Sequence, residues 1–224
     1  MDLTFSALEN ILPKLASGTV TAFIGKPCTG KSTLCMEIIM EKIDKIPVIF
    51  FMLDRPVHIV MRNIISRKEK ASHMLRIIDG YSCLSGSTRT KFDGIFQIEN
   101  ISNPSDITVT VSSVISQTGE RGLFILDSFS TILDYINEDL ATKVLNSIVA
   151  RLRENEYWSF IVFEDGIHSE QFYNKIRHIM DCIVDFKIEE SGTQIKRFFR
   201  AFVYRYGKYD TKWHPLNLSK VEII

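Results

Sequence analysis

Residues 25–32 of the chain read Gly25-Lys26-Pro27-Cys28-Thr29-Gly30-Lys31-Ser32. It matches the phosphate-binding pattern G-x-x-x-x-G-K-[ST] at every defined position. The β-rich run 19–24 precedes it and a helical pattern over residues 31–44 follows it, which is the setting that such a loop requires. Glycines allow backbone N–H groups to surround a phosphate, and the first turn of the helix adds further donors. The stretch therefore predicts a binding site for a nucleoside triphosphate, with ATP as the expected ligand.

Two side chains of this loop carry the specific chemistry. We expect the Lys31 ammonium to bind the β- and γ-phosphates and the Ser32 hydroxyl to bind Mg²⁺. The rest of the nucleotide site is assigned to the loop and to the residue after it, namely Gly25, Lys26, Pro27, Cys28, Thr29, Gly30 and Thr33. The alternative, an ordinary glycine turn, requires neither the lysine nor the serine. Cys28 is interpreted as a small loop residue, with a redox-sensitive thiol as the alternative.

A carboxylate at the end of a second apolar run predicts the other half of the metal site. The run 122–126 is apolar and ends at Asp127. In P-loop proteins an Asp in this place holds Mg²⁺ directly or through water. The alternative is an Asp that caps a turn or a helix. Because the P-loop lies about a hundred residues upstream, we favour the metal role and pair Asp127 with Ser32.

Strand and helix patterns alternate on both sides of these two segments. Apolar runs of strand length occur at 48–53, 74–78, 94–98, 123–126 and 158–163, and helical patterns at 105–117, 140–152 and 171–180. We also predict an amphipathic helix over 5–16, a helix that begins at 54–56 and a polar loop over 82–93. Later strands are predicted at 183–188, 198–206 and 221–224. The order predicts an α/β fold with three layers, a mostly parallel central sheet and an antiparallel C-terminal extension.

Composition limits the classes of protein that the chain can belong to. Its 224 residues fit one α/β domain, taken as 1–224. Lys and Arg number 27, as do Asp and Glu, so the charge gives no support to a nucleic-acid partner. The four cysteines show no C-x-x-C spacing and no secretory signal is evident, which favours reduced thiols in the cytoplasm. The longest apolar run, 46–53, is too short to span a membrane.

With these motifs in place, the chain resembles the KaiC-like branch of the RecA-type ATPases, in particular small single-domain archaeal members. The resemblance covers nearly the whole chain. It is carried by the P-loop, which alone is highly specific, and by MLRIIDGYS at 74–82, ISNPSDIT at 101–108, LDSFSTIL at 126–133 and MDCIV at 180–184. It implies a RecA-like core, ATP with Mg²⁺, and a ring or filament with the nucleotide at the subunit boundary.

Two departures from this family bear on catalysis. The family's strand after the P-loop helix ends in two glutamates, one of which activates the attacking water, and here those positions are Leu53 and Asp54. We take Asp54 as the candidate catalytic group, with Lys31, although helix capping before Pro56 is an equal alternative. The family's K-x-R-G run is replaced by YRYGK at 204–208, so Arg205 or Lys208 is only a candidate for reaching a neighbour's γ-phosphate, with surface cations as the alternative.

The functional expectation is a slow, Mg²⁺-dependent ATPase that acts through a conformational or assembly change. The alternative is a nucleotide-gated regulatory or assembly module without useful turnover, and a weaker one is a recombinase-like DNA accessory factor. The expected partner is another copy of the chain or a second protein. Glu164 and His168, after the run 158–163, are each interpreted either as a nucleotide sensor or as an ordinary surface or turn residue. ATP and GTP are not distinguished by any motif.

Overall fold

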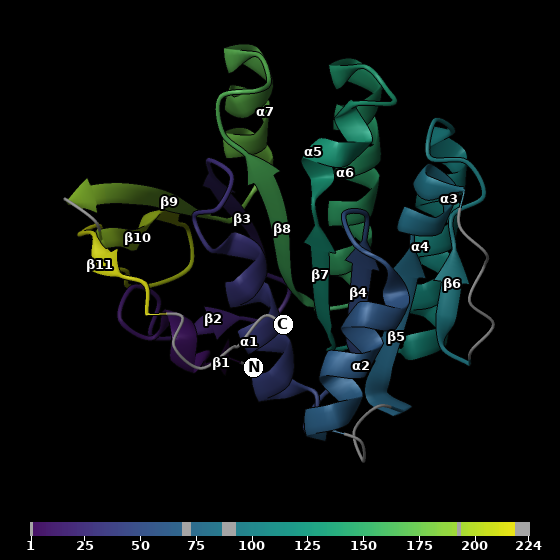
Figure 1. The fold of residues 1–224 in the computed structure, drawn as a ribbon, viewed down its shortest axis with the longest axis horizontal. Coiled ribbons are helices and arrows are strands. Elements are labelled where there is room, and N and C mark those ends of the chain that lie inside the picture. Colours follow the sequence, from purple (N-terminus) through teal and green to yellow (C-terminus); the bar gives the residue numbers. More distant parts are fainter. Residues whose placement is uncertain (1, 69–72, 87–92, 192–193, 218–224) are drawn as a thin grey trace.

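A nine-stranded sheet organises the chain in a computed structural model, which describes residues 2–68, 73–86, 93–191 and 194–217 (Figure 1). The strand order is β11-β10-β9-β3-β8-β7-β4-β5-β6. The strands are β3 (Val20–Gly25), β4 (Val48–Met52), β5 (Leu75–Asp79), β6 (Ile95–Gln97), β7 (Leu123–Asp127), β8 (Trp158–Glu164), β9 (Cys182–Ser191), β10 (Gln194–Tyr204) and β11 (His214–Pro215). Strands β3 to β9 pair in parallel, and β9, β10 and β11 pair antiparallel. The predicted mostly parallel sheet with an antiparallel extension is confirmed.

Helices cover both faces of the sheet and create two hydrophobic layers. The helices are α1 (Lys31–Lys42), α2 (Val57–Lys68), α3 (Tyr81–Ser85), α4 (Pro104–Thr118), α5 (Phe129–Leu133), α6 (Glu138–Glu154) and α7 (Glu170–Ile179). Helices α1 and α2 lie on one face of the sheet and α4 and α6 on the other (Figure 1). Buried side chains of α1 and α2 belong to one hydrophobic cluster, and those of α4, α6 and α7 to the other. Every residue of β3, β4 and β7 is buried, which is why these strands read as continuous apolar runs rather than alternating ones.

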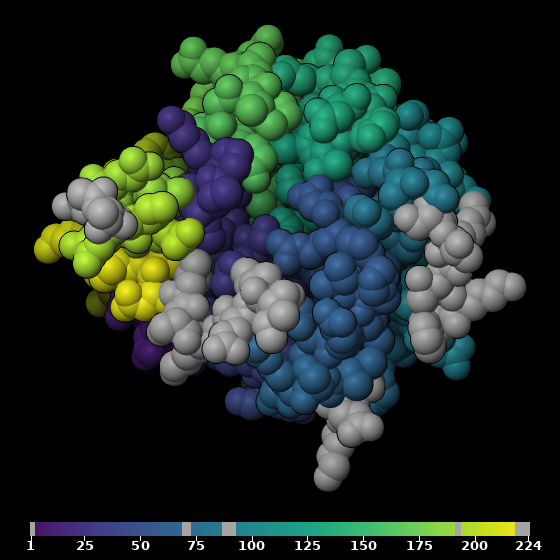
Figure 2. All heavy atoms as spheres, viewed as in Figure 1, coloured from purple at the N-terminus to yellow at the C-terminus, as the bar shows by residue number. Residues whose placement is uncertain are grey.

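The C-terminal extension lies beside the strand that carries the P-loop. Strand β9 pairs in parallel with β3, and β10 then returns antiparallel along β9. In the space-filling view the extension, coloured yellow-green to yellow, forms the left edge of the face shown, next to the purple segment (Figure 2). The predicted strand at 183–188 lies within β9, and the one predicted at 198–206 is confirmed as far as the end of β10 at Tyr204. The predicted strand at 221–224 lies outside the described residues.

The expected helix over residues 5–16 is wrong. A short 3₁₀ helix, η1 (Ser6–Leu8), begins this segment, and β2 (Leu15–Ala16) pairs with β1 (Asp2–Leu3) near its end. Pro13 explains the failure, because it has no N–H to donate and it disfavours a helical conformation at the residue before it. The apolar residues Leu8, Ile11 and Leu12 are nevertheless buried against the α1 face of the sheet.

Two other local expectations need adjustment, and one short helix was not predicted. The polar loop expected over 82–93 is partly helical, because α3 occupies its first residues, and 87–92 lie outside the described residues. The helix expected to begin at 54–56 begins at Val57. Helix α5 was not predicted, because its five residues are too few to show a helical period.

Asp181 ties the P-loop strand to α6 and to the extension. Its side chain is 2% exposed. Oδ2 accepts hydrogen bonds from the Val20 backbone N–H at 3.0 Å and from Arg153 Nε at 3.2 Å. Oδ1 accepts from Arg153 Nη2 at 2.8 Å and from the Tyr206 hydroxyl at 3.0 Å. One buried carboxylate therefore joins three parts of the chain that are distant in sequence.

We predict that Asp181→Ala lowers the free energy of unfolding by about 2–4 kcal/mol, because it leaves a buried N–H and a guanidinium without their acceptor. Chemical denaturation measures this loss. The matched control is Asp139→Ala, which removes an ion pair to Lys175 whose carboxylate is 84% exposed, and which should barely move the unfolding midpoint. Equal effects of the two substitutions would contradict the prediction.

Candidate nucleotide-binding site

The P-loop connects the end of β3 to the first residue of α1. Gly25 cannot carry a side chain here, since a Cβ would lie 2.7 Å from the Cβ of Phe186 on β9. Gly30 precedes α1 with a φ of +98°, in the left-handed region that favours glycine. Cys28 also has a positive φ, 65°, and it is exposed to solvent. The two glycines of the motif thus have steric reasons as well as a phosphate-binding reason.

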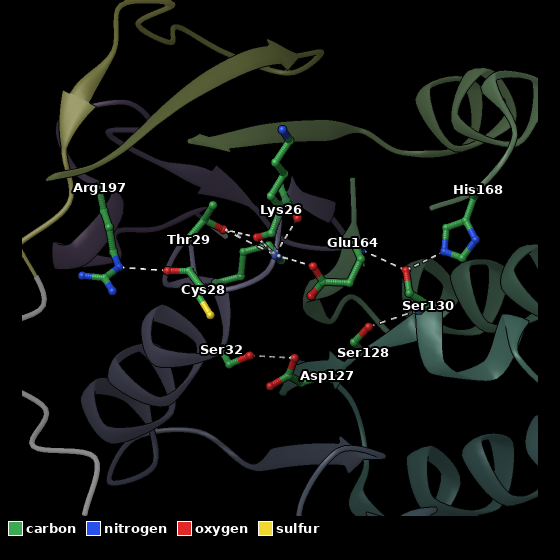
Figure 3. Close-up of polar contacts among 12 residues, drawn as sticks. Lys26, Cys28, Thr29, Ser32, Asp127, Ser128, Ser130, Glu164, His168 and Arg197 are labelled. Carbon is green, nitrogen blue, oxygen red and sulfur yellow. Dashed lines mark hydrogen bonds and ion pairs between the residues drawn. The ribbon is translucent and has the colours of Figure 1, made fainter. Parts of the chain in front are cut away.

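Lys31 lies inside the loop and is almost wholly buried, with 3% of its side chain exposed. Its Nζ donates to the carbonyl oxygens of Gly25 at 2.6 Å and Lys26 at 2.8 Å. It also forms an ion pair with Glu164 Oε2 at 3.2 Å (Figure 3). Burial lowers the pKa of Lys31, and the nearby carboxylates of Glu164 and Asp127 oppose that shift. These carboxylates help to keep a buried ammonium charged at the place where a phosphate would bind.

Ser32 and Asp127 meet across the site. The Ser32 hydroxyl donates to Asp127 Oδ1 at 3.0 Å (Figure 3). Asp127 ends β7, which is separated from β3 in the sheet by β8 alone. Burial raises the pKa of the Asp127 carboxyl to about 6, with a smaller contribution from the charge of Asp54, while the hydrogen bond from Ser32 acts in the opposite direction. The pair predicted from the sequence as metal ligands is therefore in contact.

The donor set fits Mg²⁺ bound together with a nucleotide. No group of three or more His, Cys, Asp or Glu side chains able to hold a metal occurs in the described part of the chain. Mg²⁺ commonly takes one or two carboxylates from the protein and completes its octahedron with waters and substrate phosphates. Ser32 and Asp127 supply a hydroxyl and a carboxylate beside the P-loop, which matches that requirement without a protein cage.

Asp54 lies on the same edge of the sheet, just beyond β4. It is exposed, and its Oδ1 accepts a hydrogen bond from the Thr131 hydroxyl at 2.6 Å. Leu53, in the position of the family's other glutamate, is 2% exposed, and its N–H donates to the Asp127 carbonyl at 3.1 Å. The side chain of Leu53 packs so closely on Gly80 that a Cβ there would lie 2.6 Å from it. Leu53 therefore belongs to the core, and Asp54 is the carboxylate that faces outward.

Three polar residues of the site were not predicted from the sequence. The Ser130 hydroxyl accepts a hydrogen bond from the Glu164 backbone N–H at 2.9 Å and bonds His168 Nε2 at 2.8 Å (Figure 3). The Thr131 hydroxyl donates to Asp54 Oδ1 at 2.6 Å. Arg197 on β10 donates its Nε to the Cys28 carbonyl at 3.0 Å. Ser130 and Thr131 lie three and four positions after Asp127, and this closeness in sequence was a usable signal. Nothing in the local sequence indicates Arg197.

The candidate residues for a contact with a neighbouring subunit lie elsewhere. Arg205 donates through Nη2 to the His178 carbonyl at 2.9 Å, and more weakly to that of Arg177, so it binds the carbonyl end of α7. Lys208 is exposed. A role for either side chain at another subunit stays a prediction.

Comparison with known proteins places this site in a family. The model of the KaiC ATPase family matches residues 6–224. The chain belongs to the KaiC ATPase family. This family assignment supports nucleotide binding at the P-loop, and it confirms the resemblance based on the sequence motifs. No match was found among curated proteins.

Solved structures share the RecA-like fold of this KaiC-family chain. The KaiC-like protein PH0186 from Pyrococcus horikoshii superposes with a TM-score of 0.72 at 18% identity, over 95% of this chain and 91% of that one. The uncharacterized protein PH0321 from the same organism gives 0.70 at 14% identity, over 93% and 96%. The flagellar accessory protein FlaH from Methanocaldococcus jannaschii gives 0.67 at 14% identity, over 94% and 91%. At these identities the likeness concerns the fold alone.

None of the helices in the described part of this KaiC-family chain is long and apolar enough to cross a membrane.

We predict that Asp127→Asn stabilises the chain in the absence of nucleotide at pH 8. The pKa of Asp127 is raised from 3.8 to about 6 by folding, so its contribution to stability is complete below 3.8 and is lost as the pH rises through about 6. Asparagine does not ionise and keeps an acceptor for Ser32. The expected gain at pH 8 is about 1–3 kcal/mol, measured by denaturant titration. The difference in unfolding free energy between Asp127→Asn and wild type should narrow as the pH falls toward 5. A variant less stable than wild type at pH 8 would contradict the raised pKa of Asp127.

Proposed function

We propose that this protein binds Mg-ATP at the P-loop and hydrolyses it slowly, with Lys31, Ser32, Asp127 and Asp54 as the principal side chains. The observation that carries the proposal is the meeting of Ser32 and Asp127 at 3.0 Å beside a buried, positively charged Lys31. Membership of the KaiC ATPase family supports the nucleotide. The residues 25–33 form the rest of the proposed binding site.

Each side chain has a separate task in this proposal. The loop amides and Lys31 bind the phosphates, and Lys31 exchanges its bonds to Gly25, Lys26 and Glu164 for phosphate oxygens. Ser32 and the ionised Asp127 hold Mg²⁺, which neutralises charge on the transferring phosphate when bound. Asp54 orients the attacking water and accepts its proton, since a base must lie within hydrogen-bond reach of the proton that it removes.

Slow turnover is proposed because of the length and the exposure of the Asp54 side chain. Asp54 is one methylene shorter than the glutamate of the family pattern, and it is exposed to solvent. The neighbouring position, Leu53, is apolar and buried, so no second carboxylate assists there. A shorter arm in contact with bulk water holds a nucleophilic water less firmly than an enclosed glutamate does.

Two substitutions test this proposal. Lys31→Ala should weaken ATP binding by at least about tenfold, because it removes a charge-assisted contact from a buried site. Asp54→Ala should retain ATP affinity and lose phosphate release by about a hundredfold. Calorimetry and a phosphate-release assay measure the two effects, and Lys175→Ala, which removes a distant surface lysine on α7, is the control. The same phosphate release from wild type and Lys31→Ala would exclude hydrolysis at this site.

A second candidate function is a nucleotide-gated assembly module that binds ATP without useful turnover. The buried Leu53 in place of a glutamate favours it. In either function we propose that a homo-oligomer or a protein partner responds to the nucleotide. We also propose that residues 1–224 act as one domain in the cytoplasm. DNA binding by a recombinase-like accessory factor is the least favoured role. Comparing the affinities for ATP and GTP in the same binding assay shows which of the two nucleotides the protein prefers.

The mass of the assembly distinguishes the two candidates. With Mg-ATP, both predict a larger particle by mass photometry or light scattering than without nucleotide. A turning-over ATPase leaves ADP in the particle after incubation, whereas a module without turnover leaves ATP, as chromatography of the released nucleotide shows. An unchanged mass and an unchanged melting temperature on addition of Mg-ATP would contradict the assembly response.

A further inference from the structure

The turn that follows Asp127 carries three hydroxyl groups, and each has a defined partner. The Ser128 hydroxyl accepts the Ser130 N–H at 3.2 Å and caps α5. Ser130 bonds the Glu164 backbone and His168, and the Thr131 hydroxyl donates to Asp54 Oδ1 at 2.6 Å. The hydroxyls of Ser128 and Ser130 fix α5 and the end of β8. The hydroxyl of Thr131 contacts Asp54, the residue that we assign to orient water.

Both ends of the Thr131–Asp54 bond are fixed to Asp127. Thr131 lies four positions after Asp127, and its N–H donates to the Ser128 carbonyl at 3.3 Å. On the other side, the N–H of Leu53, the residue before Asp54, donates to the Asp127 carbonyl at 3.1 Å. The bond therefore closes a ring of contacts that starts and ends at the proposed metal ligand. Within that ring the position of Asp54 relative to Asp127 is set by local geometry.

The bond also leaves Asp54 able to act. A carboxylate has about four lone-pair sites, and Thr131 occupies one of them on Oδ1. Oδ2 of Asp54 has no hydrogen-bond partner among the described residues. A threonine in a helix has few χ1 rotamers, so its hydroxyl is a well-defined donor. One oxygen is thus held in place and the other is available to water.

We propose that Thr131 is a positioning residue for Asp54. An exposed aspartate would otherwise sample several rotamers, and only part of the population would hold a water in line with the γ-phosphate. Groups in a reacting site must be held within about half an ångström of the productive geometry for full rate. Thr131 supplies that restraint for a carboxylate that is shorter than the family's glutamate. The inference rests on the proposed ATPase function and assigns to it a residue that acts through Asp54.

Three variants test the positioning role. Thr131→Val, which keeps the shape and removes the donor, should lower kcat about tenfold and leave KM and ATP affinity within about twofold. Thr131→Ser, which keeps the hydroxyl, should recover at least about half of the wild-type rate. In the Asp54→Asn background, Thr131→Val should cause no further loss, because residues that act as one unit are not additive.

The matched control is Thr142→Val on α6. Thr142 is also a half-buried helical threonine, but its hydroxyl donates to the Glu138 carbonyl within its own helix. It should leave kcat unchanged. Thermal melting of every variant separates loss of folding from loss of rate, and Thr131→Ala serves as a second variant if Thr131→Val does not fold.

The outcomes separate this inference from the function on which it rests. If wild type shows no Lys31-dependent phosphate release, the ATPase proposal fails and the positioning role fails with it. If wild type turns over and Asp54→Asn is slow, but Thr131→Val matches wild type, only the positioning role is overturned. A further loss on adding Thr131→Val to Asp54→Asn would also overturn it, since Thr131 would then act through another group.

Discussion

The close approach of β9 to Gly25 is the constraint on which the site depends. Gly25 pairs with Phe186 on one side and with Glu164 on the other, so the P-loop leaves the sheet between two parallel neighbours. A Cβ at Gly25 would collide with Phe186, so the strand can only come this close because the residue is glycine. The same alignment brings the carboxyl ends of β3, β7 and β8 to one edge. Lys31, Asp127 and Glu164 meet because those ends meet.

Charge at this edge is held at a cost to stability. Asp127 is buried and keeps a raised pKa, and Lys31 is buried with a lowered one. Hydrophobic residues of similar size would make a more stable edge, since removing ions from water is unfavourable. Elsewhere a buried carboxylate such as Asp181 has a full set of donors and joins separate segments. Two buried aspartates in one chain thus have opposite relations to stability, because one has its lone pairs satisfied and the other does not.

Most of the fold could be predicted from the sequence, because its information is local. The buried parallel strands appear as apolar runs, and the P-loop has fixed spacing, so β3, β7 and α1 were found together with Lys31, Ser32 and Asp127. The N-terminal segment was not, because Leu8, Ile11 and Leu12 have helical spacing while Pro13 prevents the helix. Apolar spacing identified which residues are buried there, but not the backbone that buries them.

The rest of the site depends on contacts between segments that the sequence does not connect. Arg197 approaches Cys28 only because β10 folds back along β9, and a lone arginine in a strand carries no mark of that partner. Ser130 and Thr131 differ, since they lie only three and four positions after Asp127. Their partners belong to other strands, Asp54 just beyond β4 and Glu164 at the end of β8, and are identified only once the strand order is known.

The hydrogen bond from Arg197 to the Cys28 carbonyl connects the antiparallel extension to the P-loop. Cys28 has a left-handed backbone conformation that non-glycine residues seldom adopt. Its carbonyl accepts a hydrogen bond from Arg197 on β10, which is not one of the parallel strands. The antiparallel extension is therefore connected to the P-loop region twice, through the pairing of β9 with β3 and through Arg197 on β10.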